Sequence, residues 1–332
     1  MLRKTLLQTV GASCAILIGL SAANAETIKI AAEEAGGGWY SYSATFTKII
    51  EKSTGGKIDV EIIPRGGGIA NPPVVDRHIA DFGFSTSNAT AWARDGLQTV
   101  YKGKKHPNVR AVIGGLQFAY TIVMARADYV KKTGLKTLDD MMSADDLPQV
   151  GMEPTGSQVP VIADFIFDSM GTSLKELRAK KTLTQVSSSQ LAQLIRDGGI
   201  DLYFENVPAG QATVTEVTLT NDIFYVPMSD KVLADLAKVG LPTGYMPKGT
   251  FKGQTEDYKT ALSATVFIVN KDVPEETVYQ VTKALVENAE TLQAEHGALK
   301  AWDPKVGCQP EQTIVDLHPG AARYYRERGW IK

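Results

Sequence analysis

Near its N-terminus the chain reads Thr27-Ile28-Lys29-Ile30-Ala31-Ala32, and this stretch begins a pattern that the chain then repeats. Its alternation of polar and apolar side chains predicts a strand, which runs into the glycine loop Gly36-Gly37-Gly38. Phe46, Ile49 and Ile50 then have the spacing of the inner face of an amphipathic helix. Strand, glycine-rich loop and helix in this order indicate an open α/β sheet.

Two more units of the same kind follow. The strand 58–63 leads into Pro64-Arg65-Gly66-Gly67-Gly68 and a helical stretch over residues 71–80. The short strand 82–84 leads into the polar cluster Ser85-Thr86-Ser87-Asn88 and another helix. Ligands of open α/β sheets lie at the carboxyl ends of the strands, so we expect the three loops to converge there.

A second series with different sequences covers the rest of the chain. We expect strands at 119–125, 149–152, 200–204 and 263–270. We expect one helix that bears Ile162, Phe165 and Ile166, one that ends before Gly198-Gly199, and one that extends over about 274–296. No linker separates the two series. Two lobes crossed by strands 120–125 and 265–270 explain this, with lobe I at 26–118 plus 268–332 and lobe II at 119–267.

The first residues predict export. We expect a signal peptide at residues 1–25 that is cleaved after Ala25. It has a basic start, Met1-Leu2-Arg3-Lys4, a short apolar run at 15–20 and the cleavage pattern Ala23-Asn24-Ala25. Cleavage of 25 residues from 332 leaves 307, and loss of the two basic residues moves the net charge from −2 to −4. This charge argues against a nucleic-acid partner. The mature chain has no apolar run of membrane-spanning length and one cysteine, Cys308, so we expect neither a membrane span nor an internal disulfide.

Motifs of the common catalytic classes are missing from the sequence. G-x-S-x-G, S-x-x-K, H-E-x-x-H and Walker A patterns do not occur, and the four histidines lack metal-ligand spacing. We therefore expect no enzyme, no catalytic residue, no bound metal and no cofactor.

Several segments together resemble the TAXI family of extracytoplasmic solute receptors, which work with TRAP transporters. They are the loop 35–42, the turn Arg65-Gly66-Gly67-Gly68-Ile69-Ala70-Asn71, the element 78–84, the helix start at 273–279 and the tail 317–329. The resemblance covers most of the mature chain, and the tail is its most specific part. It departs from the family pattern at Glu33-Glu34, at Arg65 and at Glu205-Asn206.

The resemblance implies a two-lobed α/β fold like that of type II periplasmic binding proteins, in which each lobe is an open sheet flanked by helices. A ligand cleft lies between the lobes. The implied function is capture of a small-molecule solute in the periplasm by lobe closure, and delivery to the membrane subunits of a TRAP permease. Two other classes remain open: an exported sensor subunit for a histidine kinase, and a periplasmic enzyme.

The candidate ligand-binding residues lie in the loops that we expect to face the cleft. They are Glu34, Gly38, Trp39, Tyr40, Arg65, Gly67, Asn71, Ser85, Asn88, Thr155, Gly156, Ser157, Gln158, Glu205 and Asn206. Glycines before a helix let main-chain N–H groups approach an anion, and an arginine pairs with a carboxylate. The same residues also fit plain turns, helix caps and core aromatics, and both interpretations stay open.

The resemblance implies an acidic solute, such as glutamate or a 2-oxo dicarboxylate. Glu33 and Glu34 qualify this, because an uncompensated carboxylate beside a buried anion is unfavourable. They either face solvent, pair with Arg65, or hold an amino group of the solute. The third option favours glutamate-like amino acids over 2-oxo acids.

Overall fold

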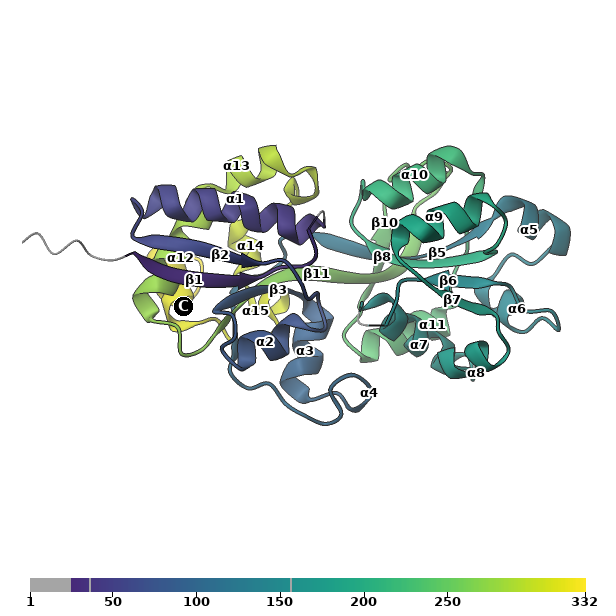
Figure 1. Ribbon diagram of the computed structural model, residues 1–332, viewed down its shortest axis with the longest axis horizontal. Coiled ribbons are helices and arrows are strands. Elements are labelled where there is room, and N and C mark those ends of the chain that lie inside the picture. The colour runs from purple at the N-terminus through teal and green to yellow at the C-terminus, as the bar shows by residue number, and fades with distance from the viewer. Residues whose placement is uncertain (1–24, 36, 156) are drawn as a thin grey trace, which may run out of the picture.

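The computed structural model describes residues 25–35, 37–155 and 157–332. The predicted signal peptide, apart from Ala25, therefore lies outside the described residues, as do Gly36 and Gly156. Figure 1 shows two groups of elements joined by long strands. We call the group that contains the first strand and the C-terminus lobe I, and the other group lobe II.

Lobe I is built on a sheet in the order β2-β1-β3-β11, with β4 also paired to β11. Its strands are β1 (Glu26–Ala31), β2 (Ile58–Ile63), β3 (Phe82–Thr86), β4 (Val109–Ile113) and the C-terminal part of β11 (Tyr258–Asn270). β1 runs parallel to β2 and β3, so the three predicted loops leave the sheet at the same edge. The expected strands at 27–32, 58–63 and 82–84 are confirmed within one or two residues.

Helices cover both faces of this sheet, as Figure 1 shows. They are α1 (Gly38–Ser53), α2 (Asn71–Asp76), α3 (Ser87–Asp95), α4 (Gln98–Tyr101), α12 (Glu275–Glu287), α13 (Ala289–Glu295), a 3-10 turn (Gly297–Leu299), α14 (Pro304–Gly307), α15 (Pro310–Thr313) and α16 (Pro319–Glu327). The inner face of α1 packs on the sheet through Phe46 and Ile50, which are fully buried among Phe84 and Phe267.

Lobe II has a mixed sheet in the order β5-β8-β6-β7, with β9 paired to β5. Its strands are β5 (Phe118–Arg126), β6 (Val150–Met152), β7 (Leu183–Gln185), β8 (Leu202–Val207), β9 (Ile223–Tyr225) and β10 (Thr243–Met246). Its helices are α5 (Ala127–Thr133), α6 (Leu138–Met142), α7 (Val159–Ser169), α8 (Leu174–Ala179), α9 (Ser188–Arg196), α10 (Ala212–Thr220) and α11 (Asp230–Lys238). One apolar cluster forms on each face of the sheet, around Phe204 and around Tyr203.

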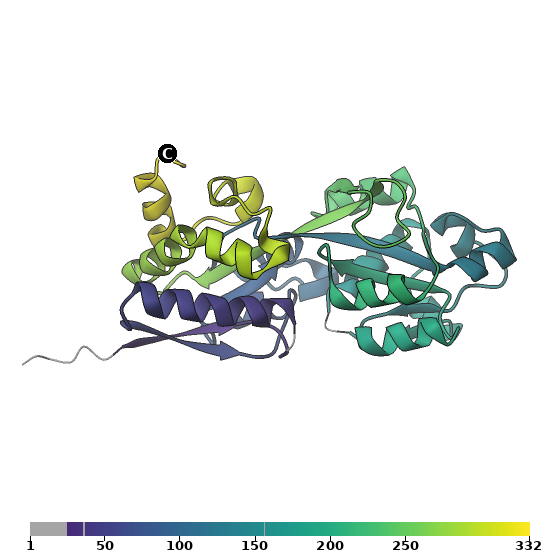
Figure 2. The same cartoon turned by 90° about the horizontal axis from the view of Figure 1, so that it is seen from above.

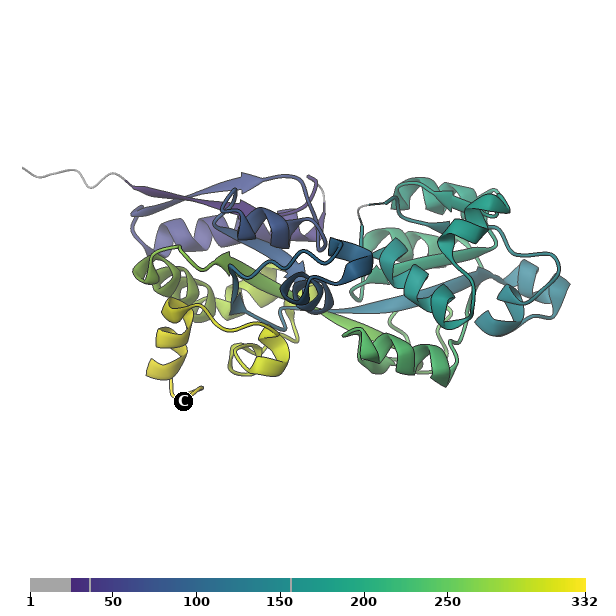
Figure 3. The same cartoon turned by 90° about the horizontal axis from the view of Figure 1, so that it is seen from below.

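Strand β11 belongs to both sheets. Its residues Leu262–Ala264 pair with the start of β5, and Thr265–Val269 pair antiparallel with β3. Figures 2 and 3 show β5 and β11 running between the lobes. Both strands are rich in buried apolar residues, which explains why the sequence contains no polar linker.

Two predicted helices differ from the structure. The predicted helix 71–80 ends at Asp76, because His78 has a positive φ of 56° that an α-helix does not allow. The predicted helix 274–296 is divided at Asn288 into α12 and α13. The Asn288 side-chain amide donates to the carbonyl of Ala284 at 2.8 Å, an alternative hydrogen bond that favours a helix end.

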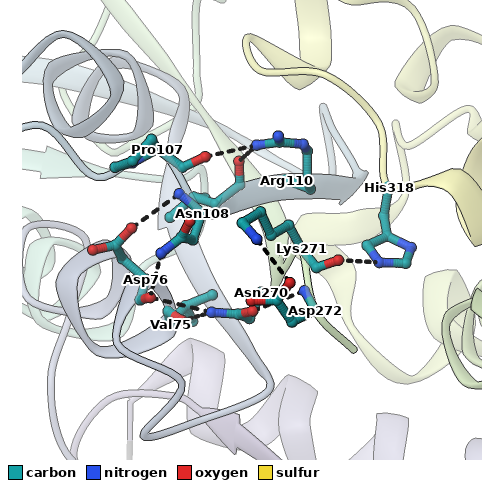
Figure 4. Close-up of polar contacts among 10 residues, drawn as sticks. Val75, Asp76, Pro107, Asn108, Arg110, Asn270, Lys271, Asp272 and His318 are labelled. Carbon is teal, nitrogen blue, oxygen red and sulfur yellow. Dashed lines mark hydrogen bonds and ion pairs between the residues drawn. The ribbon is translucent and has the colours of Figure 1, made fainter. Parts of the chain in front are cut away.

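A polar network holds the end of β11 to its neighbours in lobe I (Figure 4). The amide nitrogen of Asn270 donates to the carbonyls of Val75 at 2.7 Å and Asp76 at 3.2 Å. The Asp76 carboxylate accepts from the main-chain N–H of Asn108 at 3.0 Å. The network thus joins β11 to α2 and to the segment before β4.

The C-terminal tail is anchored to the same region through His318. Its Nδ1 accepts from Gly320 N at 3.2 Å, so the proton of the neutral ring is on Nε2, which donates to the Lys271 carbonyl at 3.2 Å. Further on, the Tyr325 hydroxyl donates to the Val112 carbonyl at 3.0 Å. These contacts pack the tail onto lobe I, and Cys308 is buried and free.

Replacement of His318 by asparagine should reduce the pH dependence of stability. Burial is the main cause that lowers the pKa of His318 below its ordinary value of 6.5. His318 therefore binds a proton more readily in the unfolded chain than in the folded chain. The stability contribution of neutral His318 is present above pH 6.5 and is lost as the pH falls below that value. In thermal unfolding between pH 7.5 and 5, His318→Asn should lose less melting temperature than wild type. A slope for His318→Asn equal to that of wild type would contradict this role.

The lobe boundaries lead to a second prediction. We propose that residues 119–267 fold on their own, because this segment supplies most of both apolar clusters of lobe II; Ala89 and Trp92 of α3 also join one cluster. The isolated segment should unfold cooperatively on heating and give dispersed amide resonances in NMR spectra. A non-cooperative transition would show that the segment depends on lobe I.

Candidate functional site

The second glycine loop, Gly66-Gly67-Gly68, is held in place by two of the predicted site residues. The fully buried Asn71 donates to the carbonyls of Ala31, Ala32 and Phe84 at 2.7–3.2 Å, and its Oδ1 accepts from Gly67 N at 3.2 Å. The Ser85 hydroxyl donates to the Gly68 carbonyl at 3.0 Å. Asn71 and Ser85 therefore shape the loop at the ends of β1 and β3, and their ligand contacts remain a prediction.

Gly68 lies where the two lobes meet. A Cβ at this position would be 3.4 Å from Gln158 Oε1, 3.5 Å from Thr86 Oγ1 and 3.6 Å from the Trp39 ring. Gln158 directly precedes α7 of lobe II, whereas the other residues belong to lobe I. We call Gly68, Thr86, Gln158 and Asn206 the interlobe junction.

A chain of side-chain hydrogen bonds crosses this junction. The Thr86 hydroxyl donates to Gln158 Oε1 at 2.8 Å, and Gln158 Nε2 donates to Asn206 Oδ1 at 2.5 Å. Asn206 Nδ2 then donates to the Thr121 hydroxyl on β5 at 3.0 Å, and the Ser263 hydroxyl on β11 donates to Asn206 Oδ1 at 3.0 Å. The chain links the two lobes directly and ends on both connecting strands.

Asn88 lies close to the junction, two residues after Thr86. Its side chain is fully buried, and among the described residues neither its Oδ1 nor its Nδ2 has a hydrogen-bond partner. Lobe II is adjacent: a Cβ on Gly240 would be 3.9 Å from the Asn88 Cα. One turn further along α3, the Trp92 indole donates to the Val239 carbonyl of lobe II at 2.6 Å.

The first glycine loop surrounds a carboxylate of the protein. Glu33 Oε1 accepts from Trp39 N at 2.6 Å, in the first turn of α1. A Cβ on Gly37 would come within 2.4 Å of that oxygen, so a larger residue there would displace the Glu33 carboxylate. A carboxylate at a helix N-terminus is stabilised by the helix dipole. Glu33 thus occupies a position that the sequence analysis assigned to a carboxylate of the solute.

Acidic side chains from both lobes act on one another here. Burial is the main cause that raises the pKa of Glu33; the hydrogen bond from Trp39 opposes it, and the charges of Glu153 and Glu34 add to it. In lobe II the buried Glu205 accepts from the Tyr203 hydroxyl. Burial, followed by the charges of Glu205 and Glu153, places the pKa of Tyr203 well above its ordinary value. The negative electrostatic potential of these acidic side chains favours a solute with a positively charged group.

The remaining predicted residues lie in several environments. Trp39 is a core residue whose indole N–H donates to Thr265 Oγ1 at 3.2 Å. The Ser157 hydroxyl accepts from Val159 N at 3.2 Å, before α7. Tyr40 and Gly67 are partly buried, and Glu34, Gly38, Arg65 and Thr155 are exposed. Within the described part of the chain, the Arg65 side chain has no recorded hydrogen bond or ion pair with Glu33 or Glu34.

Sequence reasoning missed three members of the hydrogen-bonded chain. Thr86 stands inside the polar cluster that was singled out, but it was not chosen. Thr121 and Ser263 lie within apolar strand sequences, where no local signal marks them. Only the pairing of β5 with β8 and β11 brings them to Asn206.

A family model described as the NMT1-like family matches residues 30–329. The chain belongs to this family. NMT1-like proteins are periplasmic solute-binding proteins. The match supports the expected solute-binding class, while membership of the TAXI family stays a prediction.

Solved structures show the same fold. MatC from Rhodopseudomonas palustris, solved with bound malate, is 15% identical; the match covers 92% of this chain and 97% of MatC, with a TM-score of 0.52. PhnD1 from Prochlorococcus marinus, in complex with methylphosphonate, is 12% identical; the match covers 92% of this chain and 99% of PhnD1, with a TM-score of 0.51. The predicted type II-like periplasmic-binding-protein fold is thereby confirmed.

The described residues contain no group of three or more histidine, cysteine, aspartate or glutamate side chains arranged to hold a metal ion. None of the helices within residues 25–35, 37–155 and 157–332 has both the length and the apolar character needed to cross a membrane.

Substitution of Glu33 tests the electrostatics of the site. Because the pKa of Glu33 is raised in the folded state, ionised Glu33 destabilises the fold at pH values above that folded pKa. This destabilisation disappears as the pH falls toward the ordinary value of 4.5, where the carboxyl group is protonated in the folded state. Glu33→Gln keeps an oxygen for Trp39 N and removes the charge. We expect its melting temperature to exceed that of wild type by about 1–3 °C at pH 7.5, with the difference shrinking toward pH 4.5.

Glu34→Gln is the matched control: it removes the adjacent but exposed carboxylate, whose charge is the smallest of the causes that act on Glu33, and should change the melting temperature less than Glu33→Gln does. If Glu33→Gln is instead less stable than wild type at pH 7.5, the bond from Trp39 N to the charged carboxylate outweighs its burial.

Proposed function

We propose that this solute-binding protein captures a small organic acid at the interlobe junction by closure of its two lobes, and delivers it to a TRAP-type membrane permease. The carrying observation is the hydrogen-bonded chain from Thr86 of lobe I through Gln158 to Asn206 of lobe II. Its members stand at the carboxyl end of β3, just before α7 and near the carboxyl end of β8. Ligands of α/β sheets bind at such ends.

The connections between the lobes support closure by a hinge motion. β5 and β11 pass between the lobes, and rotation about two strands leaves both cores intact. Direct bonds such as Thr86–Gln158 form only when the lobes approach each other, so a solute that bridges the lobes favours the same closed arrangement.

The proposed location is the periplasm, with cleavage of the signal peptide after Ala25. Family membership supports export. The resemblance of the glycine loops and the tail to TAXI receptors supports a TRAP permease as the partner. Delivery then depends on an ion gradient.

For the solute we place glutamate-like amino acids ahead of 2-oxo acids and dicarboxylates. Arg65 is exposed on the loop that leads to Gly68, where its positive charge attracts a carboxylate. Glu33 and the charges that act on it favour an amino group at the same site. A solute with both charges satisfies the two requirements.

A thermal-shift screen of residues 26–332 tests this function. The panel should contain amino acids, dicarboxylates, 2-oxo acids, 2-hydroxy acids, sugar acids, sulfonates and phosphonates. A bound solute raises the melting temperature according to its concentration relative to its Kd. We expect stabilisation by an amino acid that carries a side-chain carboxylate, and a reduction of the radius of gyration in small-angle scattering when it binds.

Arg65→Ala should weaken that binding by about threefold, since an exposed charge contributes modestly. Stabilisation by neutral or cationic solutes only, with Arg65→Ala indistinguishable from wild type, would overturn the acid assignment. A lack of stabilisation by every class, with no change in the radius of gyration, would overturn the receptor function.

A further inference from the structure

Asn88 combines complete burial with an unsatisfied amide. Both polar atoms of its side chain lack a hydrogen-bond partner among the described residues. Most buried side-chain polar atoms in proteins are hydrogen-bonded, because an unpaired one loses its bonds to water and gains nothing in return. Such a residue needs an explanation in terms of function or bound solvent.

The position of Asn88 favours a functional explanation. Thr86, two residues before it, donates across the junction to Gln158, and Ser87 Oγ accepts from Ala264 N of the connecting strand β11 at 3.1 Å. Gly240 of lobe II approaches the Asn88 main chain. Asn88 is therefore enclosed by the two lobes and one connecting strand, beside the proposed solute site.

We propose that Asn88 contacts the solute and selects a 2-amino or 2-hydroxy carboxylate over the corresponding 2-oxo acid. This inference rests on the proposed function. The amide offers a donor, Nδ2, and an acceptor, Oδ1. A carboxylate accepts from Nδ2, and the neighbouring 2-ammonium or 2-hydroxyl group donates to Oδ1.

A 2-oxo acid has no donor next to its carboxylate. It satisfies Nδ2 but leaves Oδ1 buried without a partner. Sites that hydrogen-bond a substrate hydroxyl or amino group reject analogues that lack the group, because a buried polar atom of the site then stays unpaired. Asn88 thus distinguishes solutes of nearly the same size and charge.

Two matched sets of solutes test the proposal on residues 26–332. They are L-glutamate, 2-hydroxyglutarate and 2-oxoglutarate, and L-alanine, lactate and pyruvate, with Kd measured by calorimetry. In at least one set, wild type should bind the amino or hydroxy member at least about tenfold more tightly than the oxo member. The comparison between the amino and hydroxy members identifies which donor the protein prefers.

Asn88→Leu removes both polar atoms and keeps the branched shape of the side chain, and Asn88→Ala provides a second, smaller replacement. Both should reduce the preference to less than about threefold. The melting temperature of unliganded Asn88→Leu should equal or exceed that of wild type, because an unpaired buried amide is removed. Thr90→Val is the matched control. It removes another polar group of α3, the Thr90 hydroxyl, which is also buried and without a partner among the described residues, and it should leave the preference unchanged.

Equal binding of the oxo member by wild type, retention of the preference in both Asn88 variants, or its loss in Thr90→Val would overturn the assignment. If neither set binds while a sulfonate or sugar acid stabilises the protein in the wider screen, the role of Asn88 fails and the receptor function stands. If no solute class stabilises it, the proposed function fails as well.

Discussion

The pairing of one strand with both sheets is the constraint on which the rest of this structure depends. β11 uses residues 262–264 to pair with β5 and residues 265–269 to pair with β3. Because main-chain hydrogen bonds run along its length, the two lobes cannot separate. We propose that they rotate about the short segment where β11 passes from one sheet to the other, next to the start of β5. The same geometry places the carboxyl ends of β3 and β8, and the loop after β6, at the interlobe junction.

The junction itself is made of neutral side chains that satisfy one another. A continuous set of hydrogen bonds joins the side chains of Thr86, Gln158, Asn206, Thr121 and Ser263. In a buried environment, neighbouring hydrogen bonds of such a set polarise and strengthen one another. Asn88, beside this set, has no such partner among the described residues. In the proposed site, the Asn88 amide would therefore gain hydrogen bonds from a solute. The solute would have to replace existing hydrogen bonds of the other junction side chains.

The glycine loops show how the same residues serve the fold before they serve a ligand. Gly37 makes room for the carboxylate of Glu33, and Gly67 and Gly68 are held by Asn71 and Ser85. The Glu33 carboxylate is bonded in the first turn of α1, whereas Arg65 is exposed to solvent. The charge distribution around the junction is thus more acidic than a simple anion receptor requires, which is why we propose a solute with an amino group.

The sequence by itself determined the order of the units, the fold class and most of the longer strands, but not β4, β7, β9 and β10. Alternation in 27–32 and the apolar runs of 119–125 and 263–270 reflect local burial, which depends on the residues themselves. It also identified two residues of the junction, Gln158 in the loop before α7 and Asn206, which the structure places inside β8 and not in the loop after it. Only the tertiary structure decided what those side chains contact. Gln158 bonds to Asn206, which lies 48 residues away, and to Thr86, 72 residues away, and no local pattern encodes such contacts. The carboxylate at the start of α1 could not be predicted either, because a glycine loop allows a ligand or the protein's own Glu33 to approach equally well.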